Sequence, residues 1–157
     1  MIDETDFALS AMLLSVLGEG SFLSLLQFLH QHAPDPSDRR DSAAGCSGDE
    51  ARHVAFGVAH LTKHVREDPA LLEHLAEAIE HRHDTLAHTA GLNEEVFDSL
   101  VLLVAGSWQP EMFRAGWGKA QILIADMGRG RVRRLRKIGF DGQKAQPLSA
   151  LHTRNFM

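Results

Sequence analysis

Two residues in the stretch GDEARHVAFG, Gly48–Gly57, have the types and the spacing of metal ligands. Glu50 and His53 are three residues apart, and in a helix this separation places both side chains on one face. Carboxylates and imidazoles are common ligands of divalent transition metals, although a lone Glu-x-x-His pair often occurs by chance. Glu19 is a third candidate, since it is the single ionisable residue between Phe7 and Leu29. A carboxylate in an apolar helix is costly unless it is neutral, paired or bound to a metal.

The elements that must position these residues are predicted to be helices, because apolar residues recur at helical spacing and no strand or hairpin pattern competes. We expect an all-α antiparallel bundle of about five helices, forming a single domain over residues 1–157. The first helix starts near Asp3 or Thr5 and is mostly buried from Phe7 to Leu29. The others are expected from about Ser37 to Asp68, from Pro69 to Thr89, from Asn93 to Trp108 and from Pro110 towards Phe140, followed by an irregular tail over 141–157.

The predicted third helix contains a second Glu-x-x-His pair, Glu80 and His83. At about 100° per residue, the apolar stripe of this helix places Glu80 far from the core, so the pair is expected to face water. Asp68 is expected to cap the same helix, with Pro69 in its first turn. Apolar positions on the stripe are Leu71, Leu75, Ile79 and Leu86, and polar positions on the opposite face are His74, His81 and His88.

Composition excludes several classes of protein. With 44% hydrophobic and 24% charged residues, the 157-residue chain has the make-up of a globular domain. Its net charge of −5 argues against a general nucleic-acid binder. The basic run RGRVRRLRK, 129–137, has the composition of a site for nucleic acid or anionic lipid, but a helix end that complements the dipole is the favoured interpretation. Cys46 is the single cysteine, so no internal disulfide is expected. Glu19 interrupts the longest apolar run, which makes a membrane span unfavourable. These features predict a cytoplasmic protein with no membrane and no nucleic-acid partner.

Other residues have structural interpretations beside functional ones. Trp108 and Trp117 are expected to pack in the core. His60 and His64 continue roughly the side of His53, and they lie either close behind the ligands or on the helix surface. Arg52 is a candidate ion-pair partner for Glu19, which would leave the carboxylate without a metal.

Two stretches resemble the metal-binding helices of a known family. GEGSFLSLLQF, around Glu19, is similar to a helix that carries a single glutamate, and DEARHVAFG is similar to the next metal-binding helix. The family is the ferritin-like di-iron carboxylate proteins, which include the ribonucleotide reductase small subunit, its ligand-binding oxidase relatives and the di-iron N-oxygenases. The resemblance implies that Glu19, Glu50 and His53 are iron ligands, with manganese as an alternative metal. It also implies that Asp49 accepts a hydrogen bond that orients a metal-bound histidine.

The resemblance covers only the C-terminal portion of such a protein. The full bundle uses four carboxylates and two imidazoles, whereas this chain offers two carboxylates and one imidazole. We therefore expect either a homodimer that buries the Phe7–Leu29 helix and shares its ligands, or a missing N-terminal half. The glycines and serines of DSAAGCSG, 41–48, weaken the helix that leads into the motif.

Two functions follow from these expectations. The first is a di-iron oxidase or oxygenase, an oxidoreductase that uses dioxygen on a small organic substrate, either complete or as a half-site completed by dimerisation. The second is a non-catalytic helical remnant or interaction module without a competent metal site. Metal binding separates them, because the first requires bound metal and the second requires none.

Overall fold

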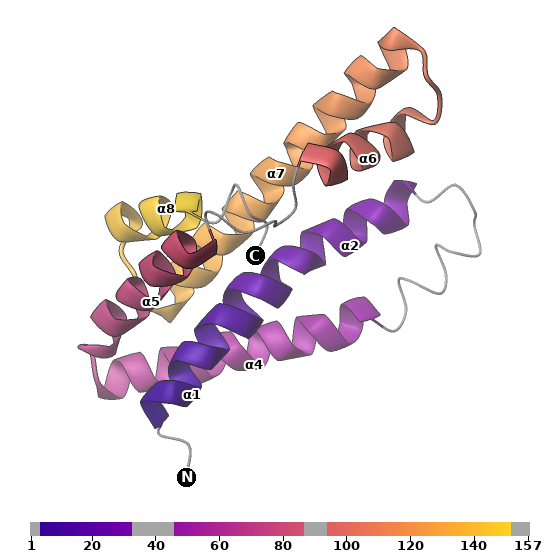
Figure 1. Cartoon of the computed structure of the whole chain (residues 1–157). Coiled ribbons are helices and arrows are strands. Elements are labelled where there is room, and N and C mark those ends of the chain that lie inside the picture. The colour runs from indigo at the N-terminus through magenta and orange to yellow at the C-terminus, as the bar shows by residue number, and fades with distance from the viewer. Residues whose placement is uncertain (1–3, 33–45, 87–93, 152–157) are drawn as a thin grey trace.

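All regular structure in the described part of the chain is helical, as the sequence predicted. The computed structural model describes residues 4–32, 46–86 and 94–151, and these ranges contain six continuous helices (Figure 1). The first is a single run of three parts, in which a π-helix, η1, joins two α-helices. The bounds are α1 Glu4–Ala11, η1 Met12–Glu19, α2 Gly20–His32, α4 Cys46–Glu67, α5 Leu71–Leu86, α6 Glu94–Ala105, α7 Pro110–Ile138 and α8 Gly142–Leu151.

Several helix boundaries agree with the sequence signals, although α6 ends at Ala105 rather than at the predicted Trp108. The Asp68 carboxylate accepts a hydrogen bond from the Ala70 backbone N–H at 3.0 Å, just before α5 begins. Pro110 occupies the first turn of α7, where a missing N–H costs nothing. The predicted start of the second helix at Ser37, the end of the third at Thr89 and the start of the fourth at Asn93 lie outside the described residues.

The predicted irregular tail over 141–157 is wrong for its first part, because Gly142–Leu151 forms helix α8. Gly142 and Pro147 both disfavour a helix. Two contributions outweigh them. The Asp141 carboxylate caps the helix by accepting the Lys144 N–H at 2.7 Å, and Ala145 and Leu148 are buried in the main core. Residues 152–157 lie outside the described ranges.

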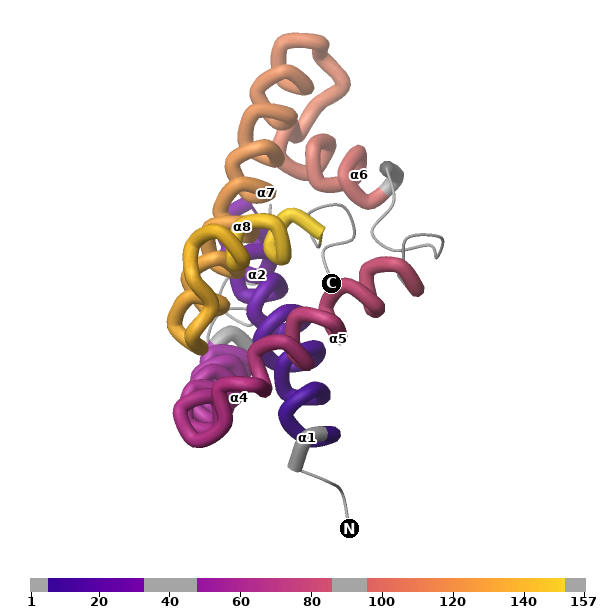
Figure 2. The backbone as a smooth tube through the Cα atoms, turned by 90° about the vertical axis from the view of Figure 1, so that its left-hand side faces the viewer, coloured from indigo at the N-terminus to yellow at the C-terminus, as the bar shows by residue number. Residues whose placement is uncertain are grey.

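The chain reverses direction between successive long helices. In Figure 1, α4 runs back along α1, η1 and α2, and α7 also runs opposite to them. The main core lies between the first helix, α4, α5, the end of α7 and α8, and a smaller core joins α2, α6 and α7 through Leu25, Phe28, Leu100, Leu123 and Met127. Figure 2 shows α6 and the adjoining half of α7 projecting from the rest of the molecule.

The prediction that both tryptophans lie in the core is wrong, because both lie exposed on this projecting hairpin. Trp108 is 78% exposed and Trp117 is 52% exposed. Trp108 lies three residues after the end of α6 and contacts Phe113, with ring centroids 5.6 Å apart. Only one face of the hairpin can pack on α2, so the aromatic residues near its tip remain in contact with solvent.

The first helix is less buried than the sequence predicted. Phe7, Leu14 and Phe22 are exposed although Met12, Val16 and Leu17 are fully buried. By length and composition the 27-residue segment Asp6–His32 could cross a membrane, and 44% of its most apolar window is buried inside the protein. A core helix of a soluble protein has the same properties, so the predicted location of the chain stays a prediction.

Candidate metal site

Glu19 is the last residue of the π-helix, and arginines from two other helices bond to that segment. A π-helix shifts the backbone hydrogen bonds from the usual spacing and is frequent at functional sites. The Leu13 carbonyl accepts a hydrogen bond from Arg82 Nη1 at 2.9 Å, and the Val16 carbonyl accepts one from Arg134 Nε at 2.9 Å. The backbone that presents Glu19 is therefore tied to both α5 and α7.

Gly20 makes room for one of these arginines. A Cβ atom at this position would lie 2.5 Å from Arg134 Nε and 2.6 Å from its Cζ. The structure thus places the Arg134 guanidinium group against Gly20. Since consecutive helical residues differ by about 100°, Gly20 can face α7 while Glu19 faces α4.

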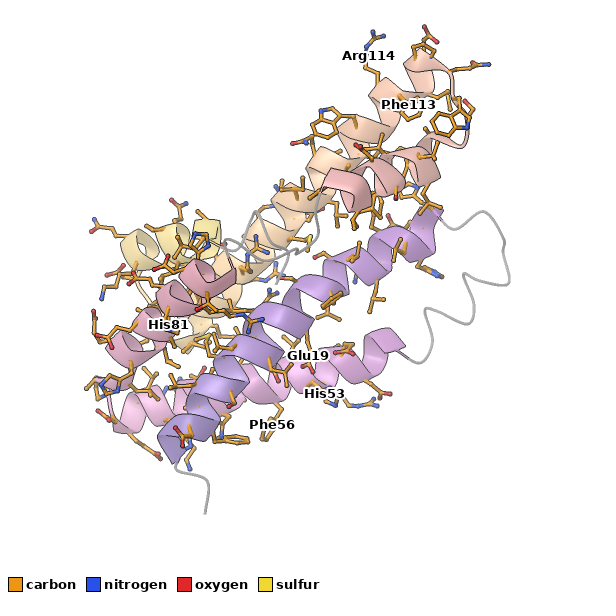
Figure 3. The ribbon with its side chains drawn as sticks, viewed as in Figure 1. Glu19, His53, Phe56, His81, Phe113 and Arg114 are labelled. Atoms are coloured by element: carbon orange, nitrogen blue, oxygen red, sulfur yellow. The ribbon has the colours of Figure 1, made fainter. Side chains whose placement is uncertain are left out.

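Helix α4 carries the other two candidates and approaches the first helix closely. Glu50 and His53 lie in its first turns, and Figure 3 shows Glu19 and His53 near one another between the two helices. The approach depends on Gly57, one turn beyond His53, where an added Cβ would lie 2.9 Å from Ser15 Cβ. The close contact of the two backbones brings side chains from separate helices to one point.

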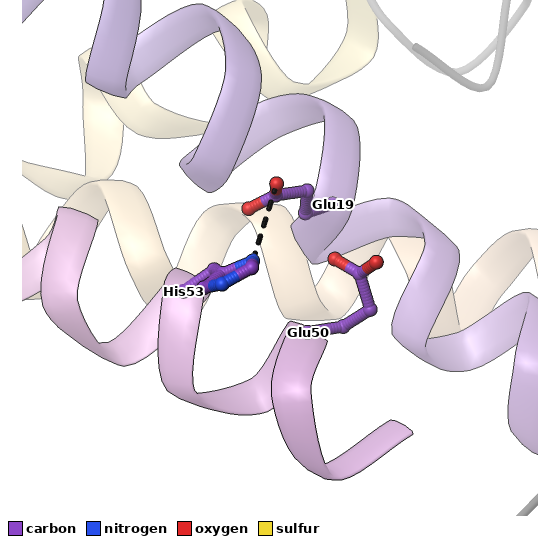
Figure 4. Close-up of side chains that lie close together, drawn as sticks. All are labelled: Glu19, Glu50 and His53. Carbon is purple, nitrogen blue, oxygen red and sulfur yellow. Dashed lines mark ion pairs between the residues drawn. The ribbon is translucent and has the colours of Figure 1, made fainter. Parts of the chain in front are cut away.

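The three side chains converge as the sequence predicted. One ligand atom from each of Glu19, Glu50 and His53 lies within 4.8 Å of the others. His53 Nδ1 is 3.6 Å from Glu19 Oε1, which is longer than a hydrogen bond but within the range of an ion pair (Figure 4). The Glu19 side chain is 21% exposed and that of His53 is 60% exposed, so the cluster opens to solvent on the His53 side.

Two carboxylate oxygens of the cluster are buried without a hydrogen-bond donor. Glu19 Oε2 and Glu50 Oε2 have no hydrogen-bond partner among the described residues. A buried carboxylate oxygen without a donor is unfavourable. The donor set of two carboxylates and one imidazole suits a divalent cation such as Fe²⁺ or Mn²⁺, and such a cation would satisfy both oxygens.

Two predicted neighbours of the ligands have a different role. Asp49 was expected to orient a histidine, and Arg52 was a candidate partner for Glu19. The structure pairs Asp49 with Arg52 instead, on the exposed side of α4. Their separation of three residues favours this local ion pair, which turns both side chains away from Glu19. The Glu19 carboxylate therefore has no arginine partner on α4.

His60 and His64 lie in an aromatic cluster about two and three turns beyond His53. The ring centroids of His60 and Phe7 are 4.8 Å apart in an edge-to-face arrangement, and those of His60 and Phe56 are 5.9 Å apart with the rings stacked. The His60 and His64 centroids are 4.4 Å apart. Neither histidine belongs to the cluster of candidate ligands. Phe56 is 61% exposed, so an apolar patch formed by Phe7 and Phe56 lies on the surface next to His53.

The second Glu-x-x-His pair is not part of any ligand cluster found in the described residues. Glu80 is exposed, as predicted, whereas His83 is half-buried. His74 and His81 are also exposed on α5, and His88 lies outside the described residues. The buried stripe of Leu71, Leu75 and Ile79 confirms the predicted orientation of this helix.

Sequence reasoning missed two arginines that hold the first helix in place. The basic run 129–137 was interpreted as a helix end that complements the dipole, without any buried arginine, but Arg131 is fully buried and Arg134 is half-buried. Arg131 donates to Ser21 Oγ at 3.1 Å and to the Ser149 carbonyl at 3.3 Å. Burial lowers the pKa of both guanidinium groups to about 10, so both are charged at neutral pH. A signal was available, since Arg131 falls on the buried stripe of α7 that includes Leu123, Met127 and Leu135.

The chain matches no protein-family model, no curated protein and no solved structure. The resemblance to the ferritin-like di-iron proteins therefore rests on the residues around Glu19, Glu50 and His53 alone. The all-helical class is confirmed, and the assignment to that family stays a prediction.

Proposed function

We propose that this chain binds a divalent metal, iron or manganese, through Glu19, Glu50 and His53. The observation that supports the proposal is that the three side chains converge while buried carboxylate oxygens among them lack hydrogen-bond donors. Two helices bring three ligand atoms within 4.8 Å, and two buried carboxylate oxygens there have no donor among the described residues. Neighbouring like charges repel unless a cation or proton intervenes, so a bound cation would stabilise the arrangement.

Each residue has a defined part in this proposal. The Glu19 and Glu50 carboxylates neutralise the positive charge of the metal, and His53 adds a neutral nitrogen ligand. Iron, when bound, supplies one-electron chemistry with dioxygen, which is the basis of oxidase and oxygenase reactions. We assign the chain to the di-iron oxidoreductases by resemblance, with a small organic substrate.

We further propose that a second copy of the chain completes the site. Three ligands are half of the set used by a di-iron bundle, and the open side of the cluster adjoins the exposed patch of Phe7 and Phe56. A two-fold dimer that covers this patch would bring two ligand sets together and remove exposed apolar surface from water. An N-terminal half supplied by another chain would meet the same need.

Anaerobic titration with ferrous ion, followed by iron analysis and sedimentation velocity, tests the proposal. We expect about one iron per chain and a dimer that holds about two. Glu50→Gln should abolish binding, whereas Glu80→Gln is a matched control, because it alters the exposed Glu-x-x-His pair on α5. A metal-free protein would instead support the non-catalytic interaction module. A monomer with two tightly bound irons would show that the half-site count is wrong.

A further inference from the structure

A groove of about 520 Å³ lies between α2 and α7, outside the candidate metal site. Its volume is in the range of small-molecule sites. Phe28 and Leu123 are core residues that also line this groove, and they give it an apolar floor. The α2 wall contributes uncharged polar side chains, including Gln27 and Gln31.

The α7 wall is strongly cationic. Lys119, Arg129 and Arg133 line it together with one carboxylate, Asp126. Asp126 pairs with Arg129, whereas neither Lys119 nor Arg133 forms an ion pair with another described residue. Three cations against one carboxylate leave two positive charges in the groove, although the chain as a whole carries a net charge of −5. This local excess favours an anionic ligand.

The positions of the cations indicate the form of the anion. Arg129 and Arg133 are four residues apart on α7, so their guanidinium groups can converge on one group. Guanidinium forks bind phosphate oxygens through paired hydrogen bonds, and a phosphate monoester carries a charge of about −1.5 to −2 at pH 7. Lys119 lies roughly 21 Å from Arg133 along the helix, too far to share the same phosphate.

We propose that the α2/α7 groove binds a small phosphate monoester with an apolar body. The phosphate lies against Arg129 and Arg133, and the body lies over Phe28 and Leu123 beside Ile122. A nucleic-acid backbone fits less well, because Arg131 and Arg134 of the same basic run turn inward and break the continuous cationic stripe that a polyanion needs. The groove is independent of the metal proposal.

Calorimetric titration with 1-naphthyl phosphate tests the groove. We expect saturable binding, weakened at least about tenfold by Arg133→Gln because a charge-assisted bidentate contact is lost. Arg114→Gln is the matched control, since it removes the same charge from an exposed position elsewhere on α7 (Figure 3), and it should leave the affinity within about twofold.

Ile122→Asp provides a second variant at an exposed position of the groove. It should also weaken binding at least about tenfold, by adding a negative charge beside the apolar body. The neutral analogue 1-naphthol should bind at least about tenfold more weakly than its phosphate. No saturable binding of 1-naphthyl phosphate, equal affinities for the two compounds, or equal losses in Arg133→Gln and Arg114→Gln would each overturn the proposal.

Discussion

Replacing Gly57 by alanine should crowd the contact between the two helices that carry the candidate ligands. The new Cβ would lie 2.9 Å from Ser15 Cβ and 3.6 Å from a Val16 methyl group. Ordinary contacts between carbon atoms are about 3.5–4.0 Å, so the helices must separate by roughly 0.6–1 Å. Ser15 Cβ is attached to the backbone and cannot rotate away, so the first helix as a whole must move away from α4.

The expected change in stability is the balance of two effects. Overpacking a core contact costs about 1–3 kcal/mol, whereas alanine is favoured over glycine in a helix interior by about 1 kcal/mol. Gly118→Ala measures the second effect alone, because nothing lies within 4 Å of an added Cβ there. We therefore expect Gly57→Ala to be about 1–3 kcal/mol less stable than Gly118→Ala.

Urea denaturation of both variants, followed by circular dichroism, provides the measurement. Gly118→Ala should be up to about 1 kcal/mol more stable than the wild type, and Gly57→Ala should be equal to it or less stable by up to about 2 kcal/mol. Equal stabilisation by both substitutions would refute the close contact between α4 and the π-helix.

Three further perturbations test the arrangement. Arg131→Met should lower the free energy of unfolding by about 1–3 kcal/mol in urea denaturation, because it leaves polar groups that bonded to the guanidinium without a donor; an unchanged value would contradict the buried hydrogen bonds. Phe56→Glu should shift the sedimentation profile from dimer to monomer, whereas Trp108→Glu, on the projecting hairpin, should not; equal effects would argue against the Phe7 and Phe56 patch as the interface. Asp141→Ala should cost about 1 kcal/mol in thermal denaturation by removing the cap of α8, and full stability in this variant would show that the cap is unimportant.

Local patterns singled out the three candidate ligands, and the resemblance to the di-iron proteins implied that they converge. Glu19 is the single ionisable residue between Phe7 and Leu29, and the spacing of Glu50 and His53 settles their shared face. The same locality explains why the cap at Asp68 and the start of α7 at Pro110 were confirmed. In each case the residue acts within one turn of the helix that contains it.

Contacts between distant segments were beyond the sequence patterns. The bond from Arg134 to the Val16 carbonyl spans 118 positions, and a basic run has the same composition whether its side chains face water or the core. Helix α8 was missed because burial of Ala145 and Leu148 outweighs the local cost of Gly142 and Pro147. The exposure of Trp108 depends on how far the α6–α7 hairpin projects, which no local pattern specifies.

Anomalous diffraction at the iron edge, from crystals loaded anaerobically with ferrous ion, tests the central claim most directly. We predict a peak in contact with Glu19, Glu50 and His53, and no peak there in the Glu50→Gln variant. Measurement on Glu80→Gln crystals provides the control, which should keep the peak. Well-ordered density for all three side chains without an anomalous peak between them, or a peak bound elsewhere on the chain, would contradict the proposed metal site.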